Sequence, residues 1–139
     1  MDLDPHTEKL KEKGLKVTPQ RIAVLEAIDR MKHHPTTDRI IEAVRKKHPN
    51  IASGTVYKVL DVLVENNLVG RVKTDKDIMR YDAVTEHHHH LYCAETQRIE
   101  DFMDEKLDHV LEEYFKKKEI NGFQVKEVRL QINGKFLNQ

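Results

Sequence analysis

The chain has 139 residues, of which 38% are hydrophobic and 35% charged, and 24 Lys and Arg balance 24 Asp and Glu. That length suits one medium domain or two small ones, and no apolar run approaches the roughly 18 residues that a membrane-spanning helix needs. The first residues lack the charged and apolar regions of a signal peptide, so we expect a cytoplasmic protein without a membrane partner.

The single cysteine, Cys93, excludes an internal disulfide and a cysteine-rich zinc site. Any bound metal must therefore be held mainly by nitrogen and oxygen. Charge is divided unevenly along the chain. Residues 1–82 carry 16 Lys and Arg against 13 Asp and Glu, a net charge of +3, whereas residues 83–139 carry 8 against 11, a net charge of −3. This mild asymmetry permits DNA binding by the first part without establishing it.

Four helices are predicted before residue 68. They run over residues 4–13, from 19 to a break at 33–35, from 37 to about 48, and from 53 to about 67. The expected N-caps of the last three are Thr18, Thr36 or Thr37, and Ser53. Pro19 suits the first helical position, where its missing N–H costs nothing.

Two short strands should follow, Leu68–Lys73 and Ile78–Asp82, joined as a hairpin by a polar turn at residues 74–77. Helices followed by a β-hairpin are the order of a winged helix-turn-helix, in which the helix from residue 53 would be the recognition helix. Its outer face offers groups that contact phosphates and base edges: Ser53, Thr55, Tyr57 and Lys58. An ordinary solvated helix face is the alternative interpretation.

Four consecutive histidines, His87, His88, His89 and His90, precede apolar Leu91 and Tyr92, so the run is predicted to start a β-strand. Side chains alternate between the faces of a strand. His88 and His90 therefore share one face, and His87 and His89 share the other. Because neutral imidazole is the commonest metal ligand and the run is internal, metal binding is favoured over a tag or simple packing.

The remainder of the chain predicts a small α/β unit. A second strand is expected at residues 97–102, a helix at about 104–119 ending before Gly122, and strand structure over residues 123–132, where the apolar phase slips. About 55 residues bury little surface alone. We therefore expect residues 83–139 to be a dimerisation and metal-sensing domain, giving an α+β protein with an N-terminal winged helix-turn-helix domain at residues 1–82.

Several spaced motifs resemble the ferric uptake regulator superfamily over nearly the whole chain. They are residues 17–21 (VTPQR), 34–36 (HPT), 53–60 (SGTVYKVL), 80–82 (RYD) before the histidine run, and 99–102 (IEDF). The resemblance implies a homodimeric, metal-dependent transcription factor that binds a double-stranded DNA operator, and it places Arg21 on the DNA-binding surface. It also implies a repressor rather than an enzyme.

Carried over by position, the family's regulatory metal site falls on His34, Asp82, His88, His90 and Asp101. Three nitrogens and two carboxylates suit Fe²⁺ or Mn²⁺. Asp101 makes the chain most similar to the peroxide-responsive branch. That branch implies iron-catalysed oxidation of a ligand histidine, here His34 or His88, followed by release of metal and DNA.

The chain departs from the family pattern at two places. Only Cys93 remains of the paired cysteines that hold structural zinc, so no structural zinc is expected. A second family site matches His87 and Asp108, with His89 in place of the usual carboxylate and Val128 in place of a histidine, so it should be weak or lost.

Three alternatives stay open at this point. The first is a repressor of the same fold that responds to iron or another metal without sensing peroxide. The second is a non-haem iron enzyme, since histidines and a carboxylate also form such centres. The third is a dimeric DNA-binding protein with no metal response.

Overall fold

The structure is a computed structural model that describes residues 4–31, 34–74, 78–83 and 87–138. It separates into two compact units, residues 1–85 and 86–139. Within the described ranges, every helix is too short or too polar to span a bilayer.

The first unit contains four helices, each begun by a recognisable local signal. They are α1 (Pro5–Glu12), α2 (Pro19–Arg30), α3 (Thr37–Arg45) and α4 (Ser53–Glu65). The Thr18 hydroxyl accepts a hydrogen bond from the N–H of Arg21 at 3.2 Å, and Thr36 does the same for Arg39 at 3.4 Å. These bonds satisfy backbone donors that a helix start leaves without partners, so both predicted N-caps are confirmed.

The prediction that Ser53 caps α4 is wrong by one residue. Ala52 is the N-cap and makes no side-chain hydrogen bond, and Ser53 is the first helical residue. The Ser53 hydroxyl instead lies 3.2 Å from Nη2 of Arg45, which also donates to the carbonyl of Ile51. A contact from the end of α3 therefore takes the group that would have capped α4.

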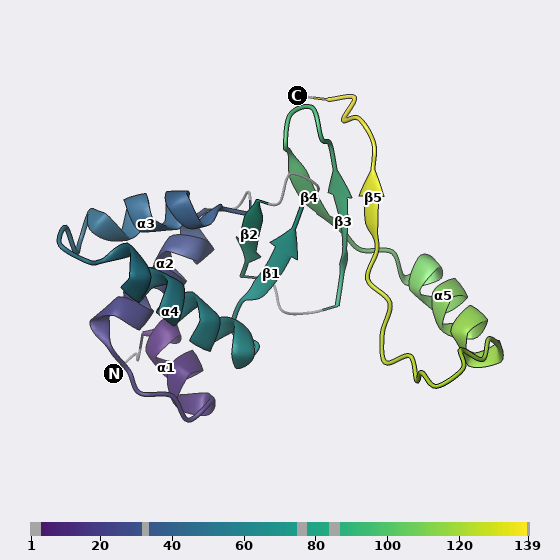
Figure 1. Cartoon of the computed structure of the whole chain (residues 1–139), viewed down its shortest axis with the longest axis horizontal. Coiled ribbons are helices and arrows are strands. Elements are labelled where there is room, and N and C mark those ends of the chain that lie inside the picture. Colours follow the sequence, from purple (N-terminus) through teal and green to yellow (C-terminus); the bar gives the residue numbers. More distant parts are fainter. Residues whose placement is uncertain (1–3, 32–33, 75–77, 84–86, 139) are drawn as a thin grey trace. The chain divides into compact units, whose positions relative to one another are not determined.

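The helices enclose one apolar core, to which every helix contributes. Its completely buried members are Leu10, Val24, Ile40, Val56, Leu60 and Leu63. Two strands, β1 (Gly70–Lys73) and β2 (Met79–Asp82), follow as an antiparallel hairpin with Arg71 opposite Tyr81. Residues 75–77 of the predicted turn lie outside the described residues. The order of elements is that of a winged helix-turn-helix (Figure 1).

The second unit is a three-stranded sheet with one helix. Strand β3 (His89–Tyr92) lies in the middle, antiparallel to β4 (Ile99–Phe102) and parallel to β5 (Gln131–Asn133) (Figure 1). Helix α5 (Glu105–Lys117) follows β4 and is capped by the Asp104 carboxylate, which accepts from the N–H of Leu107.

Two expectations for the end of the chain need correction. Helix α5 ends at Lys117, earlier than expected, because Lys118 is extended and Gly122 serves a separate turn at φ +72° between the paired residues Ile120 and Phe123. Of the strand structure predicted at residues 123–132, only residues 131 and 132 lie in a strand, which is β5 (Gln131–Asn133). The slip in apolar phase therefore marks irregular chain before β5.

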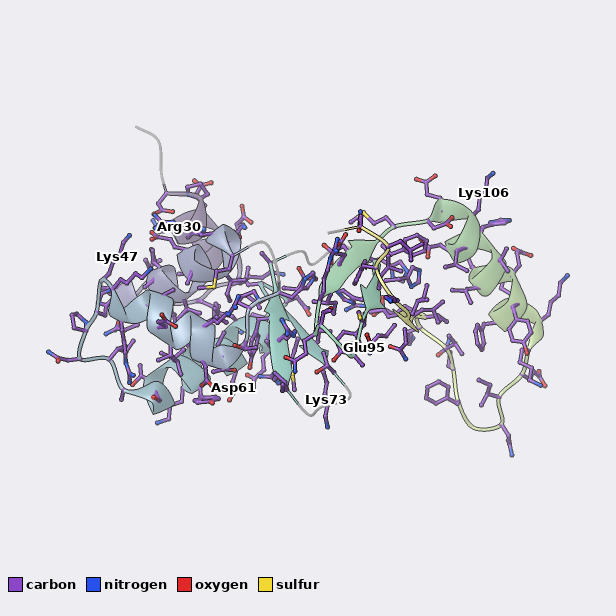
Figure 2. The ribbon with its side chains drawn as sticks, turned by 90° about the horizontal axis from the view of Figure 1, so that it is seen from above. Arg30, Lys47, Asp61, Lys73, Glu95 and Lys106 are labelled. Carbon is purple, nitrogen blue, oxygen red and sulfur yellow. The ribbon has the colours of Figure 1, made fainter. Side chains whose placement is uncertain are left out.

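Helix α5 has no buried residue. Its apolar side chains Val110 and Tyr114 are 62% and 56% exposed. Side chains project around the helix, and Lys106 near its start points outward (Figure 2). The apolar residues of α5 thus divide into exposed Val110 and Tyr114 and half-buried Leu107, Leu111 and Phe115.

Candidate metal centre

His88 and His90 form one half of the candidate centre, on one face of the strand region. His88 immediately precedes β3 and His90 is its second residue. Their Nε2 atoms lie 3.1 Å apart, so the alternation predicted for the histidine run is confirmed for this pair. Both side chains are largely shielded, with exposed fractions of 4% and 12%.

Asp101 completes this group because strand pairing sets it directly opposite His90 in β4. Its Oδ1 atom lies 3.3 Å from Nε2 of His88 and 3.5 Å from Nε2 of His90. Two nitrogens bound to one ion at about 2.1 Å lie roughly 3.0 to 3.4 Å apart for angles between 90° and 109°. The three atoms therefore have the spacing of ligands that share one metal ion.

His34 and Asp82 come together in the first unit. Nε2 of His34 lies 3.5 Å from Oδ2 of Asp82, and both side chains are buried. Two contacts fasten the His34 segment to β2: the N–H of Tyr81 donates to the carbonyl of Pro35, and Nη1 of Arg80 donates to the carbonyl of His34, each at 3.0 Å. The position of His34 beside Asp82 is therefore set by the wing.

The backbone of His34 has a φ of +54°. Residues with side chains seldom adopt this left-handed conformation, which costs free energy unless the surrounding contacts enforce it. The contacts to Arg80 and Tyr81 supply that enforcement. Such strain is often concentrated at functional sites, which agrees with a ligand role for His34.

The structure therefore brings the five predicted ligands together as two groups, His34 with Asp82 in the first unit and His88 with His90 and Asp101 in the second. Each group offers nitrogen and carboxylate oxygen, as Fe²⁺ and Mn²⁺ prefer, and neither contains sulfur. That all five bind one ion stays a prediction.

The other pair of histidines has different surroundings. His89 is completely buried, its Nε2 lies 2.5 Å from Oδ1 of Asp108 in α5, and its Nδ1 accepts the backbone N–H of Leu130 at 3.0 Å. His87 is partly exposed, 3.4 Å from the same Asp108 oxygen and 3.3 Å from Glu127. Hydrogen bonding from His89 is the main reason that the pKa of Asp108 lies below its usual range.

Glu127 was not predicted from the sequence as a neighbour of His87. It lies in the irregular segment before β5, where no periodic pattern fixes which side chains approach the sheet. Its negative charge was the only signal that the sequence offered.

Comparison with known proteins identifies the family. The model of the ferric uptake regulator family matches residues 12–133. This chain belongs to that family. It is 38% identical over 133 residues to the peroxide operon regulator of Bacillus subtilis, covering 96% of this chain and 90% of that protein. It is 30% identical to the peroxide-responsive repressor PerR of Staphylococcus epidermidis, covering 96% and 87%.

A solved structure agrees with these relatives. The peroxide stress regulator of Campylobacter jejuni is 32% identical, with a TM-score of 0.74 over 100% of this chain and 99% of that one. As a member of the ferric uptake regulator family, the chain is a metal-dependent transcriptional regulator and not an enzyme. The enzyme and the metal-independent alternatives are thereby set aside.

The predicted DNA-binding residues of this regulator lie mostly in the open. Ser53, Thr55, Tyr57 and Lys58 are exposed on α4, whereas Val56, Val59, Leu60 and Leu63 face the core. Arg21 is half-buried in α2, where its Nη1 donates to the carbonyl of Lys16 at 2.8 Å. The α4 residues thus form one accessible face, and Arg21 lies on a separate helix.

Cys93 immediately follows β3 and is buried. Hydrogen bonds from Thr96, first from its side chain and then from its backbone, hold the pKa of the Cys93 thiol below its usual range. A zinc site would need a second cysteine three residues after Cys93, and the residue at that position is Thr96, which offers a hydroxyl and no thiol.

Proposed function

We propose that this regulator is a repressor that senses hydrogen peroxide through oxidation of a histidine at an iron site. The observation that carries the proposal is the convergence of His88, His90 and Asp101 on one face of the sheet, with ligand-atom separations of 3.1 to 3.5 Å. The similarity to peroxide regulators of three organisms supports the same branch of the family.

The regulatory ion is Fe²⁺ or Mn²⁺, bound by His34, Asp82, His88, His90 and Asp101. Nitrogen and oxygen donors favour Fe²⁺ and Mn²⁺, whereas structural zinc sites commonly contain sulfur ligands. A ligand set drawn from both units would fix the angle between them and so the spacing of the two recognition helices in a dimer. Metal binding would then select the DNA-binding conformation.

In the sensing step, one oxygen of hydrogen peroxide becomes bonded to a ring carbon of His34 or His88 and replaces its hydrogen. The other oxygen leaves as water, so the imidazole is oxidised by two electrons while peroxide is reduced by two. Fe²⁺ held by these residues would supply the redox chemistry that cleaves the O–O bond, which Mn²⁺ would not. The oxidised ring is a poorer ligand, and the regulator loses its metal and leaves the operator.

In this proposal the exposed face of α4 contacts the DNA. Arg21, in the sequence motif that opens α2, supplies a further contact. The hydroxyls of Ser53 and Thr55 and the side chains of Tyr57 and Lys58 can donate to phosphates and base edges. The homodimer is formed through the second unit, whose helix α5 leaves Val110 and Tyr114 exposed. Apolar residues on an uncovered face stabilise an interface when a partner excludes water from them.

The proposed dimer has no structural zinc, because Cys93 is the only cysteine. After dialysis against a chelator, elemental analysis should find well under one zinc ion per chain while the protein remains folded. A zinc ion that resists the chelator would contradict this part of the proposal.

DNA binding measured before and after dilute peroxide tests the function. The Fe²⁺-loaded regulator should lose its operator after peroxide and should not regain it when fresh metal is added, because the histidine is modified. The Mn²⁺-loaded regulator is the matched control and should keep its operator. Equal responses of the two forms would leave a repressor that responds to metal alone.

A further inference from the structure

The second histidine face combines metal-binding residue types, since His87, His89 and Asp108 each place a ligand atom within 4.8 Å of the others. Its hydrogen bonds, however, assign a different state to His89. A neutral imidazole carries one proton, on either Nδ1 or Nε2, and its other nitrogen is an acceptor. The two contacts of His89 therefore decide which nitrogen carries the proton.

The Nδ1 atom of His89 faces a donor. It receives the backbone N–H of Leu130 at 3.0 Å, so its lone pair is occupied and its proton is absent. The proton of the neutral ring must then be on Nε2, which lies 2.5 Å from the carboxylate of Asp108. Both nitrogens are thus satisfied, and a metal ion at Nε2 would have to displace that proton from a hydrogen bond to a carboxylate.

We infer that His89 is not a metal ligand but a positioning residue, a neutral imidazole that joins β3 to α5 and to the start of β5. Leu130 immediately precedes β5, and its carbonyl accepts the N–H of His90. The His89 ring and the His90 backbone therefore both bind Leu130. Asp108 lies in the first turn of α5. One completely buried side chain therefore connects three elements of the second unit.

This arrangement also affects the opposite face. Side chains alternate along a strand, so the His89 ring lies on the face opposite His88 and His90. Its contacts hold the backbone of that strand in place, and the same backbone positions the rings of His88 and His90. Groups that are hydrogen-bonded to metal ligands commonly alter metal affinity by ten- to hundredfold, and we expect a residue that acts on the ligands through the strand to have an effect within that range. The effect on the regulatory ion depends on the proposed function, whereas the protonation state of His89 does not.

The first test is nitrogen-15 NMR of the histidine rings in the full chain, with Zn²⁺ alone as a diamagnetic probe. His89 should carry its proton on Nε2 and keep it as Zn²⁺ is added, while His88 and His90 shift. A proton on Nδ1, or loss of the Nε2 proton as zinc binds, would overturn the inference. If His88 and His90 fail to respond while His89 keeps its proton, the proposed function fails and the inference stands.

The second test uses matched variants of His89. His89→Asn keeps an acceptor near the place of Nδ1, and His89→Gln keeps a donor near the place of Nε2, so each retains one of the two contacts. Each should lower Mn²⁺ affinity about tenfold, and His89→Ala up to about a hundredfold. His87→Ala, on the same face, should leave it unchanged.

Unchanged Mn²⁺ affinity in all three His89 variants would refute the positioning role. If the alanine variant does not fold, the asparagine and glutamine variants and the NMR experiment still decide the question. The inference would also fail if the unmodified protein bound two zinc ions per chain and His89→Gln bound one, because His89 would then be a ligand.

Discussion

The two faces of the histidine run have the same residue type and opposite surroundings. On one face, Nε2 of His88 and His90 lie beside each other and beside one carboxylate oxygen, an arrangement that suits an ion. On the other, His89 is buried between a backbone donor and a carboxylate acceptor. The comparison teaches that the partners of a histidine, and not its residue type alone, decide whether its ring nitrogen can serve a metal ion: a ring whose Nδ1 accepts a backbone N–H carries its proton on Nε2.

The largest expected difference between the faces is in metal affinity. His90→Ala removes one of the five proposed metal ligands, and we expect Mn²⁺ affinity to fall by more than about a thousandfold, roughly 4 kcal/mol. Isothermal titration calorimetry measures this directly, with His87→Ala as the control from the other face. Normal Mn²⁺ binding by His90→Ala would remove the distinction between the faces.

The next difference concerns folding stability. His89→Ala leaves the Leu130 N–H and the Asp108 carboxylate without their ring partner and opens space at a completely buried position. We expect a loss of about 2 to 4 kcal/mol in the free energy of unfolding of the metal-free protein. Urea denaturation should show it, whereas His87→Ala, a partly exposed residue, should cost less than about 0.5 kcal/mol. Equal losses of unfolding free energy in the two variants would contradict the different burial and hydrogen bonding of His89 and His87.

A smaller effect is expected far from either face, on α4. Lys58→Ala removes one exposed positive charge, so operator affinity should fall about tenfold and the salt dependence of binding should decrease by about one ion. Metal affinity should stay unchanged. An unaltered salt dependence would place the DNA-contacting surface elsewhere on the first unit.

Local sequence patterns predicted much of the fold because their causes are local. Thr18 and Thr36 cap their helices as expected, and the alternation of strand side chains placed His88 with His90. The failures are of two kinds, a side-chain partner from a neighbouring helix and an element boundary. Arg45 takes the Ser53 hydroxyl, and the early end of α5 leaves Gly122 to a separate turn.

The role of His89 was equally hidden from the sequence. A run of identical residues does not reveal which ring meets a backbone N–H, and the parallel pairing of β5 with β3 brings Leu130 there from 41 residues away. The family resemblance predicted His34, Asp82 and Asp101 as ligands, but no pattern in the residues themselves connected them with the histidine run. Tertiary structure supplies the strand pairing that sets Asp101 opposite His90.

Peptide mass mapping after peroxide treatment tests the central claim most directly. In the Fe²⁺-loaded regulator, dilute peroxide should add one oxygen to the peptide carrying His34 or to that carrying His88, in proportion to the DNA released, and the Mn²⁺-loaded protein should show no such addition. Cys93 is the competing target, because hydrogen bonds from Thr96 lower the pKa of its thiol and thiolates oxidise readily. Oxygen confined to Cys93, with unmodified histidines in protein that has left the DNA, would contradict the account.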